Sequence, residues 1–286
     1  MTTKPIVVGT DGSAPARLAV QWAAAEATLR GAPLRIVSAA EILPRMNGEP
    51  AHPTGFETVA AHLVGLRSQA LAAAAKTAAA VAPDLLIDTD PVDGPPAQAV
   101  TASGSGAQLL VVGSRGAGAF AALTLGSVSR YVAGRGPCPV VVVRDRNPGE
   151  DDEAPAGHYV VVGIKNPADC SAALTFAFEE ARLRNRALFA VHAWQWGPKP
   201  PGGLTAELDD LLSVWRGKYP EVDADGEVIH GQPGRTLAEL SARADLVVLG
   251  RHHQGDRAMS GPAKVIHAVV GHAHGPVAVI PPGNPG

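Results

Sequence analysis

The stretch that decides the fold is QLLVVGSRGAGAFAALTLGSVSRYVAGRGPCPVVVV, residues 108–143. It opens with an aliphatic run, Leu109–Val112, and closes with another, Pro139–Val143. Runs this short and this apolar predict strands that are buried on both faces, as in a parallel sheet. Between them the pattern predicts a loop and then a helix from Ser127 to about Ala133. The stretch therefore predicts a strand–loop–helix–strand unit.

The loop and the start of this helix have the composition of a phosphate-binding cradle. Gly113, Gly116 and Gly126 allow the backbone to turn sharply and to approach an anion closely. Ser127 falls at the helix start, where its hydroxyl and the free N–H groups of the first turn can bind phosphate. The spacing is Gly-x2-Gly-x9-Gly-Ser.

Two better-known phosphate motifs do not fit this stretch. A Walker loop needs a Gly-Lys-Ser/Thr triplet, which is missing here, and the dinucleotide fingerprint has different glycine spacing. The alternative is that the glycines only make a tight strand–loop–helix connection.

Length and composition narrow the class of protein. The chain has 286 residues, 46% of them hydrophobic, which suggests two domains with buried cores. The net charge of −3 and the absence of a Lys/Arg-rich run give no footprint for nucleic acid. Cys138 and Cys170 suggest neither a disulfide framework nor a metal knuckle. The first residues do not resemble a signal peptide, and we find no stretch apolar enough to span a bilayer, so we expect a cytoplasmic protein without a membrane partner.

The first half predicts alternating strands and helices. Strands are expected at 5–9, 33–39 and 85–92, and helices at 57–82 and 97–103, with a loop at 41–56. With the two strands of residues 108–143, this alternation predicts a parallel sheet with helices on both faces.

The first helix has recognisable ends. Ser13 is expected to cap its start, and Gly31 follows its last residue. Helical spacing places Leu18, Trp22, Ala25 and Leu29 on one face, so we expect this face, with Trp22, to lie in the core.

Asp11 lies directly after the first strand, at the carboxyl end, where open α/β sheets bind their ligands. A carboxylate there can accept a hydrogen bond from a ribose hydroxyl or hold a hydrated magnesium ion. The alternative is an Asx turn in which Asp11 satisfies the backbone donors of Gly12 and Ser13.

The second half of the chain repeats the first. Residues 145–158 are polar and rich in Pro and Gly, as expected of a linker. After it, Gly163 aligns with Gly9 at an offset of 163 − 9 = 154, and near the end Gly250 aligns with Gly113 at 250 − 113 = 137. The smaller offset places a shorter segment before the third strand of the second copy. A repeat of this length indicates two copies of one domain.

The second copy departs from the first where the chemistry would occur. Lys165 stands at the position of Asp11, His253 at that of Gly116, and Ala263-Lys264 at that of Gly126-Ser127. A histidine side chain would crowd out a phosphate, so we expect a degenerate site. The histidines of this stretch do not offer four zinc ligands at any usual spacing, so no metal site is expected.

The quoted motifs resemble the universal stress protein family, and both halves together look like a tandem member of it. The resemblance implies two α/β domains, at 1–146 and 158–286, the first with an intact nucleotide signature and the second with a degenerate one. Each would be a doubly wound, five-stranded parallel sheet of order 3-2-1-4-5 with helices on both faces.

The resemblance also implies roles for residues of the first copy. Thr10 and Asp11 would lie beside the adenine and ribose, and the Ala39 backbone would meet the adenine edge. The remaining candidates would border the ribose and phosphates or hold phosphate through N–H groups and a hydroxyl: Gly113, Arg115, Gly116, Gly126, Ser127 and Val128. No catalytic and no metal-ligating residue is assigned.

The function implied is that of an ATP-binding stress-response regulator whose nucleotide, alone or with Mg²⁺, is held by the first domain. Two alternatives remain open: a weak ATPase or other nucleotide-processing enzyme, and a structural or partner-binding protein with unused pockets. The family also associates through its last strand. We therefore expect Val140–Val143 to pair with Val277–Ile280 in a pseudo-twofold body, with homodimer formation left open.

Overall fold

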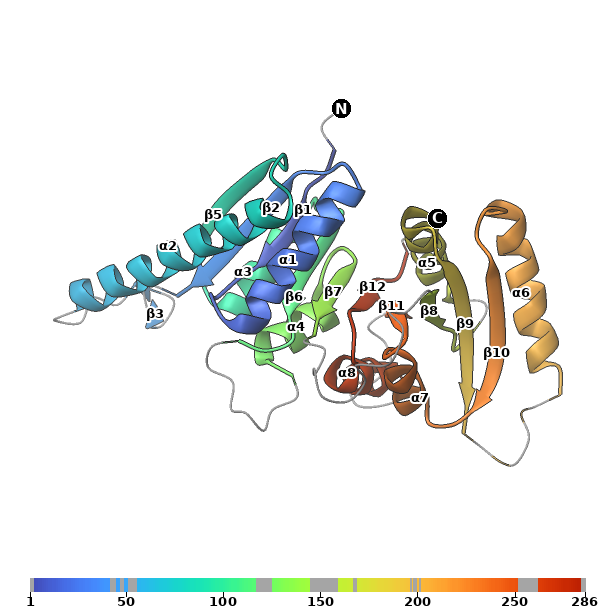
Figure 1. Cartoon of the computed structure of the whole chain (residues 1–286). Helices are drawn as coiled ribbons and strands as arrows, with labels where there is room; N and C mark the ends of the chain where they lie inside the picture. The colour runs from blue at the N-terminus through green and yellow to red at the C-terminus, as the bar shows by residue number, and fades with distance from the viewer. Residues whose placement is uncertain are drawn as a thin grey trace. The chain divides into compact units, whose positions relative to one another are not determined.

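The computed structural model describes residues 3–41, 45–46, 49–50, 56–116, 125–144, 159–166, 169–195, 197, 200, 202–251 and 262–283. The chain divides into two compact units, unit 1 at Met1–Val143 and unit 2 at Arg144–Gly286. Figure 1 shows the elements of both. The predicted linker, 145–158, lies outside the described residues. Among the residues described, no helix is long and apolar enough to cross a membrane.

Unit 1 alternates strands and helices along the chain. Its elements are β1 (Ile6–Gly9), α1 (Ala14–Leu29), β2 (Leu34–Ala40), β3 (Arg45–Met46), β4 (Glu49–Pro50), α2 (Phe56–Val81), β5 (Ile87–Asp93), α3 (Pro96–Ser103), β6 (Leu109–Gly113), α4 (Ser127–Arg135) and β7 (Val140–Val143). Five strands form parallel pairs in the order β5-β2-β1-β6-β7. This is the predicted order 3-2-1-4-5.

Unit 2 repeats this arrangement. Its elements are β8 (Tyr159–Gly163), α5 (Ser171–Arg184), β9 (Ala187–Trp194), α6 (Leu204–Lys218), β10 (Ala224–His230), α7 (Pro233–Leu240), β11 (Ala244–Gly250), α8 (Pro262–His272) and β12 (Val277–Ile280). The parallel pairs give β10-β9-β8-β11-β12, again the predicted order. The segment before the third strand is shorter, as expected, since α6 has 15 residues where α2 has 26.

One short element was not expected. The segment 41–56 was predicted to be a loop, but β3 and β4 form a small antiparallel pair within it. The two strands have only two residues each, which is too short for hydrophobic alternation to be visible in the sequence.

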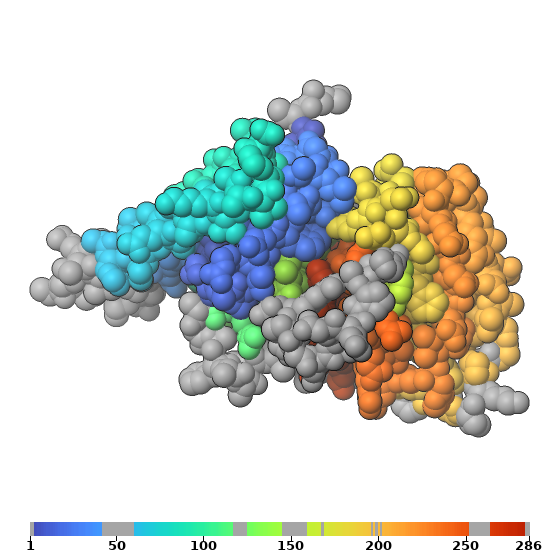
Figure 2. Space-filling view, in the orientation of Figure 1, coloured from blue at the N-terminus to red at the C-terminus, as the bar shows by residue number. Residues whose placement is uncertain are grey.

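Helices cover both faces of the unit 1 sheet. α1 packs beside α2, and α3 packs beside α4. In Figure 1 the pair α1 and α2 lies in front of the strands, and Figure 2 shows the same pair, coloured blue to cyan, as a continuous surface.

The buried face of α1 differs from the predicted one. Ser13 caps the helix, and its Oγ accepts from the Ala16 N–H at 3.3 Å, as expected. The buried stripe, however, consists mainly of small residues: Ala16, Ala19, Val20, Ala23, Ala24 and Ala27. Ala25 is exposed and Leu29 is 41% exposed, while Leu18 and Trp22 are half-buried. Small side chains face the sheet because α1 lies very close to it.

Unit 2 places large aromatic side chains between α5 and α6. Phe178 of α5 is fully buried and stacks with Trp215 of α6 and with Tyr219, at centroid distances of 5.6 and 5.2 Å. Cys170 is buried before α5, and burial raises the pKa of its thiol to about 11.

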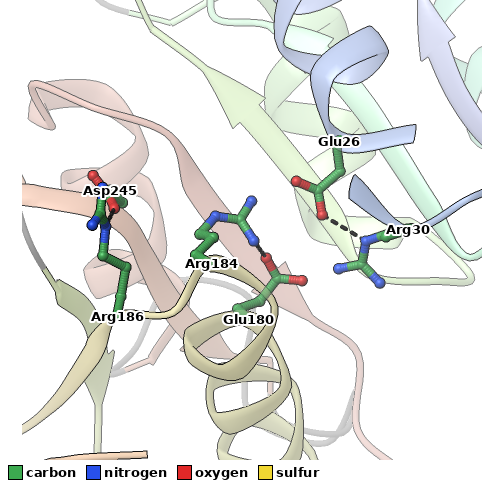
Figure 3. A network of polar contacts seen from close by, with 6 residues as sticks. All are labelled: Glu26, Arg30, Glu180, Arg184, Arg186 and Asp245. Carbon is green, nitrogen blue, oxygen red and sulfur yellow. Dashed lines mark hydrogen bonds and ion pairs between the residues drawn. The ribbon is translucent and has the colours of Figure 1, made fainter. Parts of the chain in front are cut away.

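Each unit also contains a buried glutamate on its first helix. Glu26 forms an ion pair with Arg30, Glu26 Oε1 to Arg30 Nε at 2.5 Å, and Glu180 forms one with Arg184 (Figure 3). Both pairs are four residues apart and related by the offset 180 − 26 = 154. In unit 2, Arg186 also binds Asp245 at 2.7 Å. The repeat therefore conserves a buried polar contact as well as the apolar pattern.

Candidate functional site

The predicted site residues of unit 1 are all described, and they come from one edge of its sheet. β1, β2 and β6 are parallel neighbours, with Val8 level with Ile36 and with Val111. Their carboxyl ends therefore lie together, and the residues that follow them are brought side by side. The loop at 117–124, between β6 and α4, lies outside the described residues.

Asp11 connects the end of β1 with the glycine-rich turn after β6. Its Oδ1 accepts from the Ser13 N–H at 3.0 Å, as in the Asx turn given above as the alternative, whereas the Gly12 N–H donates to Thr10 Oγ1 instead of Asp11. Its Oδ2 is 2.6 Å from the position that a Cβ on Gly116 would occupy. The exposed carboxylate thus has one oxygen bonded to the Ser13 N–H and the other close to Gly116. The Asx turn thus does not remove Asp11 from the site.

Gly126 is held against the same turn. Its N–H donates to the Ser114 carbonyl at 2.8 Å. A Cβ on Gly126 would be 3.4 Å from Arg115 Cα and 3.6 Å from the Gly116 nitrogen. The two ends of the Gly-x2-Gly-x9-Gly-Ser motif are consequently in contact.

The start of α4 faces this contact. Gly126 caps the helix, Ser127 is its first residue and is exposed, and Val128 is half-buried. The first N–H groups of a helix have no partner within it and favour an anion. The first turn of α4 contains no acidic residue that would oppose one.

Ser129 anchors α4 to β6, a role that the sequence did not reveal. Its buried hydroxyl donates to the Gly113 carbonyl at 2.6 Å. The only signal in the sequence is a serine in the first turn of a helix, which usually indicates exposure rather than an anchor.

Gly113 has a structural reason to be glycine. A Cβ there would be 2.6 Å from the Pro15 carbonyl oxygen and 2.9 Å from the Ala16 nitrogen. The first turn of α1 therefore packs directly on the end of β6. This close packing fixes Asp11, which precedes α1, relative to Gly116, which follows β6.

Thr10 and Ala39 complete the edge. Thr10 is buried, its N–H donates to the Val37 carbonyl at 2.8 Å, and its Oγ1 accepts from the Gly12 N–H at 3.2 Å. Because backbone groups alternate sides along a strand, the N–H and C=O of Ala39 point to the same side as those of Val37. The backbone groups of Ala39 therefore point from β2 towards the space that lies beyond Thr10 at the carboxyl end of β1.

Arg115 is half-buried between Ser114 and Gly116. In the part of the chain that the structure describes, no hydrogen bond or ion pair holds its guanidinium. Its charged group is therefore not fixed by neighbours among the described residues.

At the carboxyl ends of the unit 2 strands, lysines stand at the positions of Asp11 and Ser127. Lys165 follows β8 and is exposed, and Lys264 is exposed near the start of α8. Gly250 is not packed as Gly113 is, since a Cβ there would be 3.5 Å from Ala173 Cβ, an ordinary contact. His253 lies outside the described residues, and the side chain of Ala263 is not described.

Histidines of unit 2 do not form a metal site within the described residues. Those residues contain no group of three or more His, Cys, Asp or Glu side chains that could hold a metal ion. His252 and His253 fall outside them. On β9, burial lowers the pKa of His192, and the nearby Glu207 opposes this shift.

Comparisons with known proteins identify the family of the chain. The family model described as "Universal stress protein family" matches residues 2–144 and 158–281. A universal stress protein of Mycolicibacterium smegmatis is 33% identical over 264 residues, 87% of each chain. One of Mycobacterium tuberculosis H37Rv is 32% identical over 293 residues, 96% of each chain.

A solved structure shows the same fold across the chain. The crystal structure of a universal stress protein from Archaeoglobus fulgidus superposes with a TM-score of 0.70 at 18% identity, covering 99% of this chain and 98% of that one. With two matching segments, relatives of the same length and the fold in common, the chain belongs to the universal stress protein family and contains two of its domains in tandem.

Proposed function

We propose that unit 1 binds an adenine nucleotide, ATP with Mg²⁺, and that the protein acts as a nucleotide-binding regulator in a stress response. The observation that carries this proposal is the meeting of Asp11, Gly116, Gly126 and the first turn of α4 at one edge of the sheet. A carboxylate and a helix N-terminus with no acidic residue in its first turn lie side by side there, which suits a ligand with hydroxyls at one end and phosphates at the other.

Each group has a task that its position supports. The N–H groups of the first turn of α4 and the Ser127 hydroxyl would bind phosphate oxygens. Asp11 would accept from a ribose hydroxyl or from water bound to Mg²⁺, an ion that usually takes one or two carboxylates together with phosphates. The Ala39 backbone would meet the edge of the base. Arg115 is free to turn its charge towards the phosphates.

The experiment is a titration of the full chain with Mg-ATP by isothermal titration calorimetry. Gly116→Val fills the space that Asp11 Oδ2 occupies, and Gly134→Val is the matched control because a Cβ at Gly134 meets open space. We expect one site per chain with micromolar affinity, about −8 kcal/mol, in the wild type and in Gly134→Val. Gly116→Val should not bind while its circular dichroism stays native.

Other outcomes separate the alternatives. Equal affinity in Gly116→Val would refute the site, and two equivalents of ATP per chain would show that unit 2 is not degenerate. Phosphate released above a protein-free control, and lost in Asp11→Ala, would identify an ATPase instead of a regulator.

A further inference from the structure

Unit 2 has a hollow at the amino ends of its strands, opposite the carboxyl ends where Lys165 and Lys264 lie. It measures about 280 Å³ and lies at the amino ends of β8, β9 and β10, which are neighbours in Figure 1. Its lining is formed by Tyr159, Ala187, Leu188, Phe189, Asp223 and Asp225.

The floor of the hollow is aromatic and its rim is acidic. The rings of Tyr159 and Phe189 meet edge to face, with centroids 6.2 Å apart at 68°, and both side chains are half-buried. Asp225 on the adjacent strand β10 and Asp223, which directly precedes this strand, are both exposed. An apolar surface bordered by two carboxylates favours an organic cation over an anion or a neutral ligand.

The one cation within ion-pair distance of these carboxylates, among the described residues, is Arg216. Its Nε donates to the Ala224 carbonyl at 2.8 Å, and its Nη2 is 3.9 Å from Asp225 Oδ1. The same Oδ1 accepts from the Gly226 N–H at 2.8 Å. The side chain of Asp225 nevertheless remains 83% exposed, so its second oxygen is accessible.

In unit 1 the corresponding pair of strand positions is occupied by an ion pair. The register pairs Arg35 with Asp88 in unit 1 and Phe189 with Asp225 in unit 2. Arg35 and Asp88 form a cross-strand ion pair, Nε to Oδ2 at 3.6 Å. Unit 2 therefore keeps the carboxylate but has a phenyl ring where unit 1 has a guanidinium.

We propose that this hollow binds a small organic cation that carries a guanidinium group. The ligand binds the accessible second oxygen of Asp225, beside the Arg216 guanidinium that lies 3.9 Å from Oδ1, and its planar face lies against the ring of Phe189. The volume is slightly below that of pockets for drug-sized molecules, about 300–1,000 Å³, so a short alkylguanidinium fits better than a larger ligand. The proposal is independent of nucleotide binding by unit 1.

The test uses ethylguanidinium as the probe and N-ethylurea as its neutral analogue. Chemical-shift changes of the backbone amides of the full chain are followed during titration with each compound. Asp225→Asn removes the rim charge, and Phe189→Arg places in unit 2 the side chain found in unit 1. Asp88→Asn is the matched control, because it makes the same change at the equivalent position of the other unit.

We expect saturable binding of ethylguanidinium, with shifts concentrated at the ends of β8, β9 and β10, and no saturable binding of N-ethylurea. Asp225→Asn should weaken binding about five-fold, equivalent to about 1 kcal/mol. Phe189→Arg should abolish it, and Asp88→Asn should leave it unchanged. Equal binding of the neutral analogue, or wild-type affinity in Asp225→Asn, would overturn the proposal. Asp225 is exposed, so this second result stands even where Phe189→Arg fails to fold.

Discussion

Replacement of Gly113 by alanine tests the close packing of α1 on β6. The added Cβ would be 2.6 Å from the Pro15 carbonyl oxygen, 2.7 Å from its carbon and 2.9 Å from the Ala16 nitrogen. These are backbone atoms, so no side chain can rotate away. To restore a contact of 3.4 Å, the first turn of α1 must move by 3.4 − 2.6 = 0.8 Å.

The cost of this movement can be estimated from the elements involved. The first turn is tied by the hydrogen bond of Arg17 to Ser13 at 2.9 Å, and Ala16 and Ala19 behind it are buried against the sheet. Overpacking of this kind costs about 1–3 kcal/mol, and contact with fixed backbone places Gly113→Ala near the upper end. The melting temperature of unit 1 should fall by about 6–10 °C.

Gly250→Ala is the matched control in unit 2. Its added Cβ would make an ordinary 3.5 Å contact with Ala173, so the free energy of unfolding should change by less than about 0.5 kcal/mol. Both variants are compared with the wild type by urea unfolding followed by circular dichroism. Equal stability of Gly113→Ala and Gly250→Ala would show that α1 does not pack tightly on Gly113.

Three further predictions concern the site and unit 2. Ser129→Ala should lower the free energy of unfolding by about 1–2 kcal/mol, because it leaves the buried Gly113 carbonyl without its donor. Ser127→Ala, at an exposed position, should weaken ATP binding without lowering this free energy. Urea unfolding measures the stability of both variants, and calorimetry measures their ATP binding. Asp11→Asn should keep the turn at Ser13 but weaken Mg-ATP binding about ten-fold, about 1.4 kcal/mol, and an unchanged affinity would remove Asp11 from the site. The pKa of His192 lies below 6.5 in the folded state, so the unfolded chain binds more protons, and the stability of unit 2 should fall as the pH drops below about 6.5. His192→Gln should show a flatter pH dependence of urea unfolding between pH 7.5 and 5.5, and identical slopes would contradict this prediction.

The alternation of strands and helices was predictable from the sequence because the inner strands β1, β6 and β7 are buried on both faces, whereas the order 3-2-1-4-5 was implied by the family resemblance. Runs such as Leu109–Val112 and Val140–Val143 are apolar throughout, and the glycines and prolines between elements mark the turns. The buried face of α1 was not predictable in the same way. Periodicity favoured the large residues Leu18, Trp22 and Leu29, whereas the distance to the sheet admits only small ones. That distance depends on Gly113, almost a hundred positions along the chain.

In the candidate site, too, local features were predictable from the sequence and tertiary contacts were not. Motif spacing indicated that Gly116, Gly126 and Ser127 surround a turn and a helix start, and they lie together there, because these are local features; their role in binding stays a prediction. The anchoring hydrogen bond of Ser129 depends on which side of α4 faces β6, which only the folded chain determines. The pairing of β7 with β12 stays a prediction.

The different cores of the two units have a consequence for how the chain reaches its native state. Two halves with the same strand order run the risk that an element of one half enters the other during folding. The alanine-lined face of α1 would leave a void in the place of α5, where Phe178 fills the space against Trp215 and Tyr219. Phe178 stands at the position of Ala24 (178 − 154 = 24), so α5 in the place of α1 would bring its ring into the close packing of that helix on α2. From this difference in side-chain volume we expect an exchanged helix to pack poorly in the other unit, so the native pairing of helix and sheet is the more stable one.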